Sequence, residues 1–488
     1  MLIAVEGCCH GELDKIYETL AYIESTHGRK VDLLLCCGDF QAVRNINDLS
    51  CLAAPEKHLR MQDFFKYYSG EKTAPIPTIF IGGNHEASNH LQELAYGGWV
   101  ANNIYYLGNA GVIRFGGLRI AGLSGIYNGH NYRKGHFEVP PYTESTKRSV
   151  YHVRQLELFR LKQISRPLDI FMSHDWPVGV TDYGNKEMLL RFKPYFQEDI
   201  ENGQLGNPTT WDLLKKLQPR YWFSGHLHAK FAASIPHVGA GSTNFLALDK
   251  CVPGKRFLQI LEVPHDPAEP LTLSYDPEWL GILQQTNHLW SFDSLPQYMP
   301  GPGGAEPFDF TQSDARMEEV KGVFGGGSLT VDPGAFQRTA PVHEAELGNG
   351  AYTRVLDEMI KRRFPLPPRK NFVNPQTTEL CARLGLTDPL VALIAKNPHA
   401  TPPVIRETAP AADLNVGQTE MLKMAVSDGG GNPEEIDLDE GSALVDDGAG
   451  TLYVVEDYIP GVAAWDSAGV DASTRSSEPD AKKLKLVE

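Results

Sequence analysis

The sequence predicts an α/β protein whose β-sheets are flanked by helices, followed by a C-terminal extension. Short apolar runs of strand length recur through residues 2–263, and segments with helical spacing lie between them. The chain has 488 residues and is 42% hydrophobic, which is enough for a large buried core. The formal charge of −16 lies mostly in the last part, because residues 1–300 contribute −3 and residues 301–488 contribute −13.

The elements follow in chain order. A strand at 2–5 leads through Cys8-Cys9-His10 to a helix whose apolar residues recur at Leu13, Ile16 and Leu20. This order is the opening of a βα unit. The segment from Lys147 to Ile164 predicts a later helix. The other strands are expected at 31–35, 78–81, 118–121, 170–172, 221–223 and 257–263.

Composition divides the chain into four parts. Residues 1–290 hold the predicted strands and form the expected main domain. Residues 291–330 are rich in Pro and Gly, which predicts a linker, and residues 331–400 regain some order. Residues 401–488 have 18 acidic and 6 basic side chains and few aromatics. Such a composition cannot bury a core, so an acidic, disordered tail is expected.

The cysteines favour a reducing compartment. Four of the seven cysteines form two adjacent pairs, Cys8-Cys9 and Cys36-Cys37, inside apolar segments. Adjacent buried cysteines make a poor disulfide framework. No apolar run approaches the roughly 20 residues that span a bilayer, and no signal peptide or membrane association is expected.

Polar residues of metal-ligand type directly follow five of the predicted strands. Loops at the carboxyl ends of strands converge on one crevice in α/β proteins, so these residues are expected to lie together. The five loops contain Cys8-Cys9-His10, Gly38-Asp39, Gly82-Gly83-Asn84-His85-Glu86, Ser173-His174-Asp175 and Gly225-His226-Leu227-His228.

The residue types suit a site for two metal ions that cleaves phosphoesters. Such a site needs six or seven N or O ligands and one shared carboxylate, which Asp39 can provide with its two oxygens. Asn84 offers a neutral carbonyl oxygen, and an extended segment would point His226 and His228 to the same side. Alone, a Gly-Asp pair is usually a turn and a single histidine is usually a satisfied polar residue. The conjunction of five loops favours the metal site.

Several of these blocks resemble those of the calcineurin-like metallophosphoesterases. That family usually opens with Asp-x-His, whereas Cys8 stands at the Asp position here. This change resembles the RNA lariat debranching enzymes, and the similarity covers roughly residues 1–390. The matching motifs are Gly38-Asp39, Gly82 to Glu86, Gly225 to His228, Cys8-Cys9-His10-Gly11, Ser173-His174-Asp175-Trp176-Pro177, Leu123-Ser124-Gly125-Ile126-Tyr127 and Asn374-Pro375-Gln376-Thr377-Thr378-Glu379.

The resemblance implies a metallophosphoesterase-type layered fold and a metal-dependent hydrolase. Residues 1–290 would form its catalytic domain and residues 331–400 the debranching-enzyme C-terminal domain. The implied reaction is hydrolysis of the 2′,5′-phosphodiester at the branch point of excised intron lariats, by a hydroxide that a binuclear metal centre activates. His85 would donate a proton to the leaving 2′-oxygen.

The resemblance also implies two divalent ions, with iron, zinc or manganese as candidates. One ion would be held by His10, Asp39 and His228, with Cys8 nearby. The other would be held by Asp39, Asn84, His174 and His226. A Cys8 thiolate would favour zinc or iron over magnesium. Alternatively, Cys8 stays protonated and leaves that side of the centre weak.

A basic, aromatic segment predicts RNA binding. Residues 114–166 contain ten Lys or Arg and three Glu, interleaved with aromatic side chains. Cations can meet phosphates, and rings can stack on splayed bases. We expect a recognition loop at about 126–148, whereas a solvated helix face explains 154–166 equally well. The candidate RNA-binding residues are Tyr127, Arg133, Lys134, Tyr142, Lys147 and Arg148.

Two other functions compete with a debranching enzyme. A general phosphatase or phosphodiesterase of the same superfamily would share the metals but have no use for a basic aromatic loop. A non-catalytic protein-binding scaffold would not need both His85 and the full ligand set. Lys482-Lys483-Leu484-Lys485 resembles a nuclear-localisation signal, or is only a solvated tail end. We expect branched RNA as partner, nuclear localisation with shuttling to the cytoplasm, and protein partners for the tail.

Overall fold

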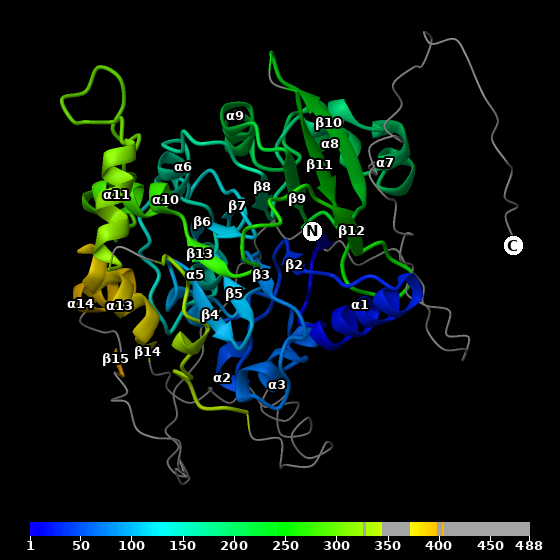
Figure 1. The fold of residues 1–488 in the computed structure, drawn as a ribbon, viewed down its shortest axis with the longest axis horizontal. Coiled ribbons are helices and arrows are strands. Elements are labelled where there is room, and N and C mark those ends of the chain that lie inside the picture. The colour runs from blue at the N-terminus through cyan, green and yellow to red at the C-terminus, as the bar shows by residue number, and fades with distance from the viewer. Residues whose placement is uncertain (240, 326–327, 344–370, 398–402, 405–488) are drawn as a thin grey trace, which may run out of the picture.

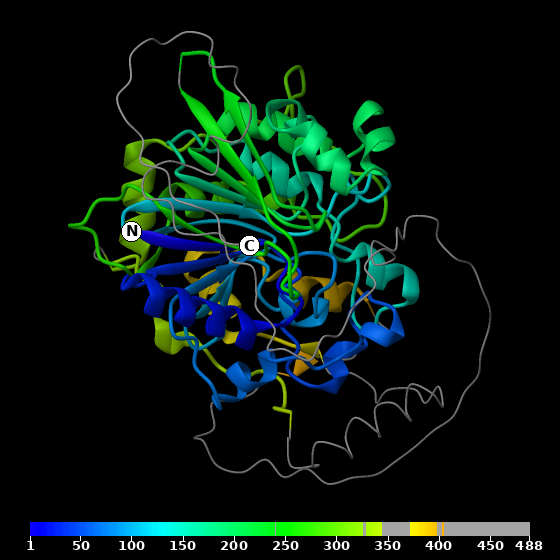
Figure 2. The same cartoon turned by 90° about the vertical axis from the view of Figure 1, so that its right-hand side faces the viewer.

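Two β-sheets stack face to face, and helices cover both outer faces (Figure 1). The computed structural model describes residues 1–239, 241–325, 328–343, 371–397 and 403–404. Figure 2 shows the layers edge-on, with the sheet that contains the N-terminal strand below the other. A cluster of buried apolar side chains from both sheets fills the space between them. The predicted layered α/β fold is confirmed.

The first sheet has six strands. Its central strands β1, β2, β3 and β5 are parallel, and β12 and β4 pair with them antiparallel. In spatial order the strands are β12 (Leu258–Glu262), β1 (Leu2–Glu6), β2 (Leu33–Cys36), β3 (Thr78–Phe80), β5 (Ile104–Tyr106) and β4 (Gly98–Ala101). The helices near this sheet include α1 (Leu13–His27), α2 (Ile46–Leu49), α3 (Phe64–Ser69) and α4 (Ser88–Gln92).

The second sheet has seven strands, of which β11, β9, β8 and β7 are parallel neighbours. In spatial order they are β10 (Phe231–Pro236), β11 (Ser242–Ala247), β9 (Tyr221–Ser224), β8 (Ile170–Ser173), β7 (Leu118–Leu123), β6 (Ala110–Phe115) and β13 (Leu273–Tyr275). The helices of this half include α5 (Glu144–Ser149), α6 (Gln155–Leu161), α7 (Lys186–Phe192), α8 (Phe196–Glu201), α9 (Pro208–Leu217) and α10 (Pro277–Gln285).

Burial on both faces explains why the central strands are continuous apolar runs. In β1, Ile3 and Val5 face the second sheet, whereas Leu2 and Ala4 face the helices. Parallel strands inside such a sandwich have no solvent face, so they lack the polar alternation of an exposed strand. The seven predicted strands all coincide with strands of the structure.

The prediction of one helix from Lys147 to Ile164 is wrong. Helices α5 and α6 are separate, and between them His152 forms an isolated bridge with Ile126. Arg154 causes the interruption, because its buried guanidinium donates to backbone oxygens and to Glu138. The backbone at Arg154 is extended, with φ of −106° and ψ of 157°.

The C-terminal part packs onto this sandwich. Helix α11 (Asp314–Val323) lies inside the segment expected to be a linker, and its Val320 is buried. Helices α13 (Pro375–Leu384) and α14 (Pro389–Lys396) follow. The Gln376 carboxamide accepts the Trp99 N–H at 2.8 Å and donates to the Trp99 carbonyl at 2.9 Å, on the outer edge of β4.

Parts of the predicted organisation lie outside the described residues. These parts are residues 326–327 of the expected linker, residues 344–370 and 398–400 of the expected C-terminal domain, and the acidic tail apart from 403–404. Those two residues form strand β15 (Pro403–Val404), which pairs with β14 (Asn371–Phe372), so the start of the expected disordered tail is ordered. None of the helices in the described ranges has the length and apolar character needed to cross a membrane.

Candidate metal centre

The candidate ligands lie at the carboxyl ends of parallel strands in both sheets. In the first sheet, β1 leads to Cys8 and His10, β2 to Asp39, and β3 to Asn84. In the second sheet, β8 leads to His174, and β9 to His226 and His228. The stacked sheets bring these strand ends to one side of the sandwich, as parallel strands in α/β folds do.

One group of donors surrounds the thiol of Cys8. The ligand atoms of Cys8, His10, Asp39 and His228 all lie within 4.8 Å of one another. His10 Nε2 is 3.3 Å from His228 Nε2 and 3.6 Å from Asp39 Oδ2. Converging imidazole nitrogens, a carboxylate oxygen and a sulfur suit a divalent transition metal.

A second group gathers at the other oxygen of Asp39. His174 Nε2 is 3.2 Å from Asp39 Oδ1 and 3.2 Å from Asn84 Oδ1. The His226 ring centroid is 5.0 Å from that of His174. Asp39 therefore offers one oxygen to each group. The structure brings all seven predicted ligands together, and their coordination roles stay predictions.

Unusual backbone conformations present these ligands. His10, Asp39, His226 and His228 have positive φ of 45°, 48°, 64° and 46°. Non-glycine residues there carry about 1–3 kcal/mol of strain each and cluster at functional sites. The expectation of an extended segment at His226 and His228 is wrong, because both residues adopt left-handed conformations.

Two glycines let the ligand loops approach closely. A Cβ on Gly38, which has a φ of 110°, would lie 2.2 Å from His174 Nδ1. A Cβ on Gly83 would lie 2.2 Å from Asp39 Oδ1. No side chain fits at either position while the donors stay where they are.

Partners that the sequence did not reveal hold the ligands. His174 Nδ1 lies 2.7 Å from the Cys37 carbonyl, which directs Nε2 toward Asp39. The Glu86 carboxylate accepts the backbone N–H groups of Phe40 and Gln41 at 2.8 Å and of Gly83 at 2.9 Å. Glu86 thereby ties the Asp39 loop to the Asn84 loop. The position of Glu86 at the end of the motif Gly82 to Glu86 was the sequence signal that could have revealed this role.

The protonation states suit metal ligands. Burial opposes ionisation of Asp39, but His174 and other nearby histidines hold its pKa well below the usual range. Burial lowers the pKa of His10 to about 4 and that of His226 to about 3. These residues therefore offer an ionised carboxylate and neutral imidazoles near pH 7, the forms that bind metals. His174 is the exception: burial would lower its pKa, but Asp39 raises it to about 9, so a metal would have to displace a proton from this imidazole.

Cys8 lies in a different electrostatic setting. Burial raises the pKa of its thiol well above the ordinary value, and the carboxylates of Asp39 and Glu6 act in the same direction. The His226 N–H donates to Sγ at 2.9 Å. The surrounding protein therefore favours a protonated thiol, and a cation at the donor cluster would be needed to favour the thiolate.

His85 stands beside the ligands. Its N–H donates to Asp39 Oδ1 at 2.9 Å, and its ring centroid is 5.6 Å from that of His10. Its Nδ1 is 2.8 Å from the Ala53 carbonyl oxygen. Because a carbonyl only accepts, Nδ1 carries a proton, and Nε2 is the ring nitrogen left for proton transfer.

Comparison with known proteins matches this centre to a family. Residues 1–230 match the model of the calcineurin-like phosphoesterases, and residues 240–389 match that of the lariat debranching enzyme C-terminal domain. Lariat debranching enzyme A of Xenopus laevis is 53% identical over 80% of this chain and 71% of its own length. The chain belongs to the lariat debranching enzyme family. The Arabidopsis thaliana enzyme is 60% identical over 79% of this chain and 86% of its own. The Homo sapiens enzyme is 49% identical over 90% and 80%.

Membership of the lariat debranching enzyme family confirms the class of enzyme expected from the sequence, a metal-dependent phosphodiesterase. Calcineurin-like phosphoesterases use a centre of two divalent ions, which the two donor groups around Asp39 fit. The C-terminal family model begins at residue 240, inside the range 1–290 that was expected to be catalytic.

Asp175 connects the expected recognition loop to the candidate metal centre. The Tyr127 N–H donates to Asp175 Oδ2 at 2.6 Å, and Asp175 Oδ1 lies 3.6 Å from His226 Nε2. The Arg133 guanidinium lies 5.6 Å from the ring centroid of Tyr298. Tyr142 is buried and donates to Gln92, so its predicted place on an RNA-binding surface is wrong.

The other loop cations pair within the loop or near it. The Lys134 ammonium lies 5.7 Å from the Phe137 ring centroid, and Lys147 Nζ lies 2.7 Å from Glu144. Arg148 follows Lys147 in the last turn of α5. Their predicted contacts with RNA stay predictions.

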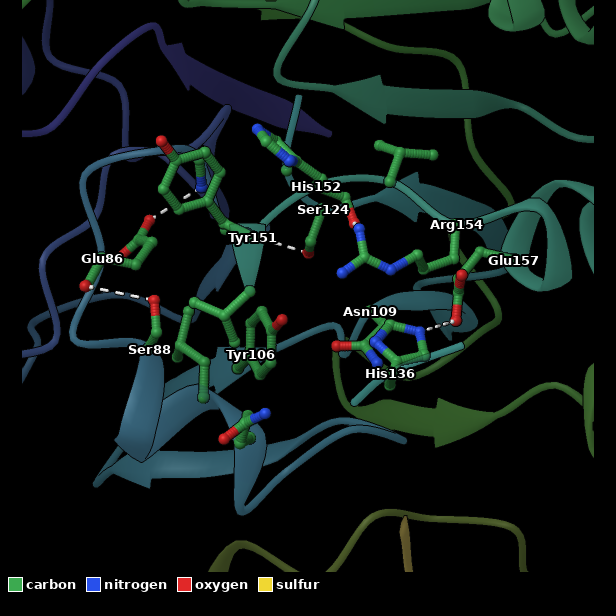
Figure 3. Close-up of a pocket in the computed structure, with 17 residues that line it drawn as sticks. Glu86, Ser88, Tyr106, Asn109, Ser124, His136, Tyr151, His152, Arg154 and Glu157 are labelled. Atoms are coloured by element: carbon green, nitrogen blue, oxygen red, sulfur yellow. Dashed lines mark hydrogen bonds and ion pairs between the residues drawn. The ribbon is translucent and has the colours of Figure 1, made fainter. Parts of the chain in front are cut away.

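A cavity of about 50 Å³, lined by both polar and apolar side chains, lies between the Asn84 loop and the base of the recognition loop (Figure 3). Its lining includes Glu86, Ser124, His152 and Glu157. His136 and Glu157 Oε1 are 2.8 Å apart, whereas Glu157 Oε2 has no hydrogen-bond partner in the described structure. A water needs about 10–15 Å³ of such space, so the cavity suits a few bridging waters.

Proposed function

We propose that this protein hydrolyses the 2′,5′-phosphodiester at the branch point of excised intron lariats. The observation that carries the proposal is the convergence of Cys8, His10, Asp39 and His228 within 4.8 Å in a chain of the debranching family. Cys8 distinguishes this donor set from the Asp-x-His opening of other metallophosphoesterases.

The donor sets fit two divalent cations. His10, Asp39 and His228 would hold one, with Cys8 beside it, and Asp39, Asn84, His174 and His226 would hold the other. When bound, two such ions stabilise charge on the phosphate and make water nucleophilic near neutral pH. The sulfur favours zinc or iron at the Cys8 group, with manganese as the further candidate.

The protein's own side chains complete the reaction. Water loses a proton and adds to phosphorus as hydroxide, the bond between phosphorus and the 2′-oxygen breaks, and His85 Nε2 gives its proton to that oxygen. The proton that water releases balances the one that His85 supplies. The Ala53 carbonyl keeps the Nδ1 proton in place, so the donating form of His85 is the imidazolium. General acid assistance of this kind contributes about 10²–10⁴-fold to rate.

Substrate binding falls to the recognition loop at 126–148. Arg133, Lys134, Lys147 and Arg148 would meet phosphates, and the Tyr127 ring would stack on a base. Asp175 would couple the position of this loop to His226. Nuclear localisation with shuttling, and protein partners for the tail at 401–488, belong to the same proposal.

Metal analysis paired with RNA cleavage tests the proposal. Purified protein should hold two ions per chain and cut a branched RNA but not a linear 3′,5′ control. Asp39→Ala should lose both metals and activity while keeping its circular dichroism spectrum, and His226→Ala should lose metal from one group. Full metal content and normal turnover in Asp39→Ala would overturn the ligand assignment. Equal cleavage of the linear control would favour a general phosphodiesterase.

A further inference from the structure

The strand order of the second sheet places a basic loop on the far side of the metal centre from the recognition loop. The parallel neighbours are β11, β9, β8 and β7. The loops after β9 and β8 carry the histidine ligands, and the recognition loop follows β7. The loop at 249–256 follows β11. The ligands therefore lie between two flanking loops.

Backbone contacts with the first sheet place the two flanks in the same order. The Cys8 N–H donates to the Asp249 carbonyl at 3.3 Å, and the Cys251 N–H donates to the Cys8 carbonyl at 3.1 Å. At the other side, the Gly125 N–H donates to the Gly82 carbonyl at 2.8 Å. Figure 1 shows α7 and α8 on the side of the second sheet where β10 and β11 lie, and α5 and α6 on the opposite side.

The 249–256 loop is rich in cations. It contains Lys250, Lys255 and Arg256, with Asp249 as its single acidic residue. Asp249 is buried and accepts the Lys250 N–H at 2.8 Å, and Lys255 Nζ lies 3.8 Å from it. Within residues 249–256, three positive side chains thus stand against one carboxylate.

Exposed aromatic side chains lie on the same side of the second sheet as this loop. Phe192 and Tyr195, at the turn between α7 and α8, are 77% and 49% exposed. Lys193 Nζ lies 5.9 Å from the Tyr195 ring centroid. Burial raises the pKa of Tyr195, Lys255 lowers it and Asp249 raises it. We name Phe192, Lys193, Tyr195, Lys250, Lys255 and Arg256 the β11 flank.

We infer that the β11 flank binds one arm of a branched RNA while the recognition loop binds another. This inference rests on the proposed function. Three arms leave a branch point in different directions, and the reacting phosphate must lie at the metals, between the two flanks. Cations beside exposed rings are the combination that holds single-stranded nucleic acid. Lys250, next to Cys8, would meet the phosphates nearest the branch.

A variant of the outer flank tests the inference. It combines Lys193→Gln, Tyr195→Ser and Lys255→Gln, and leaves Lys250 intact because that residue adjoins the metal ligands. The matched control combines Tyr22→Ser, Lys30→Gln and Lys321→Gln. Tyr22 lies in the C-terminal half of α1 and Lys30 lies beyond its end, away from the ligand loop that precedes the helix. All three control side chains are exposed.

Fluorescence anisotropy with a branched RNA, in a His85→Ala background to prevent cutting, measures affinity against salt. The flank variant should bind roughly 10- to 100-fold more weakly than the control, because it loses one ring on which a base can stack and two positive charges. Its log–log salt slope should fall by about 1.4, because each lost single-strand phosphate contact removes about 0.7. Metal content and, with His85 restored, hydrolysis of a small nitrophenyl phosphodiester should match the control.

Branched RNAs that each lack one arm identify the bound strand. The difference between flank and control variants should disappear with one of the three shortened substrates and persist with the other two. Equal affinity and equal salt slope of flank and control variants would overturn the inference. Normal RNA binding with lost binding of a polyglutamate peptide would assign the surface to an acidic protein instead. If the parent protein cuts no branched RNA at all, the proposed function fails, which is a separate result.

Discussion

Arg44 is completely buried, and its replacement by methionine should destabilise the fold severely. Its Nε and Nη2 donate to Asp48 at 2.8 and 3.1 Å, and its Nη1 donates to Glu93 at 2.6 Å and to Thr339 at 2.9 Å. Arg44→Met keeps most of the volume but leaves two buried carboxylates without their cation. Breaking a buried ion pair by removing one partner costs about 3–5 kcal/mol of unfolding free energy.

The loss should depend on pH. Burial raises the pKa of Glu93 to about 7, and Arg44 opposes that rise. Without Arg44, the folded pKa moves further above the ordinary value of 4.5, so the folded variant binds a proton that the unfolded chain releases. Stability of the variant then falls as pH rises from about 4.5 through the raised pKa. The difference from the parent should be larger at pH 8 than at pH 6.

Urea unfolding followed by tryptophan fluorescence, at constant metal concentration, measures these differences. Arg29→Met is the control, because Arg29 pairs with Glu262 on the surface and such pairs contribute about 0–1 kcal/mol. A loss below about 1 kcal/mol for Arg44→Met at pH 8, or an equal loss at both pH values, would refute the reasoning.

Three further predictions concern catalysis. His85→Ala should keep its metals and RNA affinity but lose about 10²–10⁴-fold in cleavage of the 2′,5′ linkage, and far less on a nitrophenyl ester that needs no proton. Equal losses on both substrates would make His85 structural. A chain ending at residue 400 should debranch RNA at close to the full-length rate, and an inactive but folded product would contradict this. Neutralising the loop cations Arg133, Lys134, Lys147 and Arg148 should weaken RNA binding and reduce its salt dependence, and should change hydrolysis of the small ester little. Equal losses on both substrates would exclude a role of these residues in RNA recognition.

The sequence predicted the elements whose environment is uniform along the chain. Central strands such as β2 and β8 are buried on both faces, so their apolar runs identify them. Strand β10 was not predicted, because its buried residues alternate with partly exposed ones and it ends on a proline. The break between α5 and α6 depends on what Arg154 contacts across the fold, which no local pattern reports.

The metal site divides in the same way. The convergence of its candidate ligands was predictable because each follows a strand and has a chemistry that folding does not require. The groups that orient these residues were not predictable. Ala53 contacts His85 and Asp175 contacts Tyr127 only because the fold brings distant parts of the sequence together. Tyr142 resembled a stacking residue by composition alone, and only the fold shows that it is buried and bonded to Gln92.

The pair of hydrogen bonds between Gln376 and Trp99 has a consequence for solubility. A carboxamide offers the same donor and acceptor as a peptide group, so Gln376 stands in for the next strand beside β4. Uncovered strand edges are templates on which other chains add and aggregate. A chain shortened before α13 would lose this cover and tend to associate edge to edge. By this argument, α13 protects the edge of β4 from pairing with a strand of another chain.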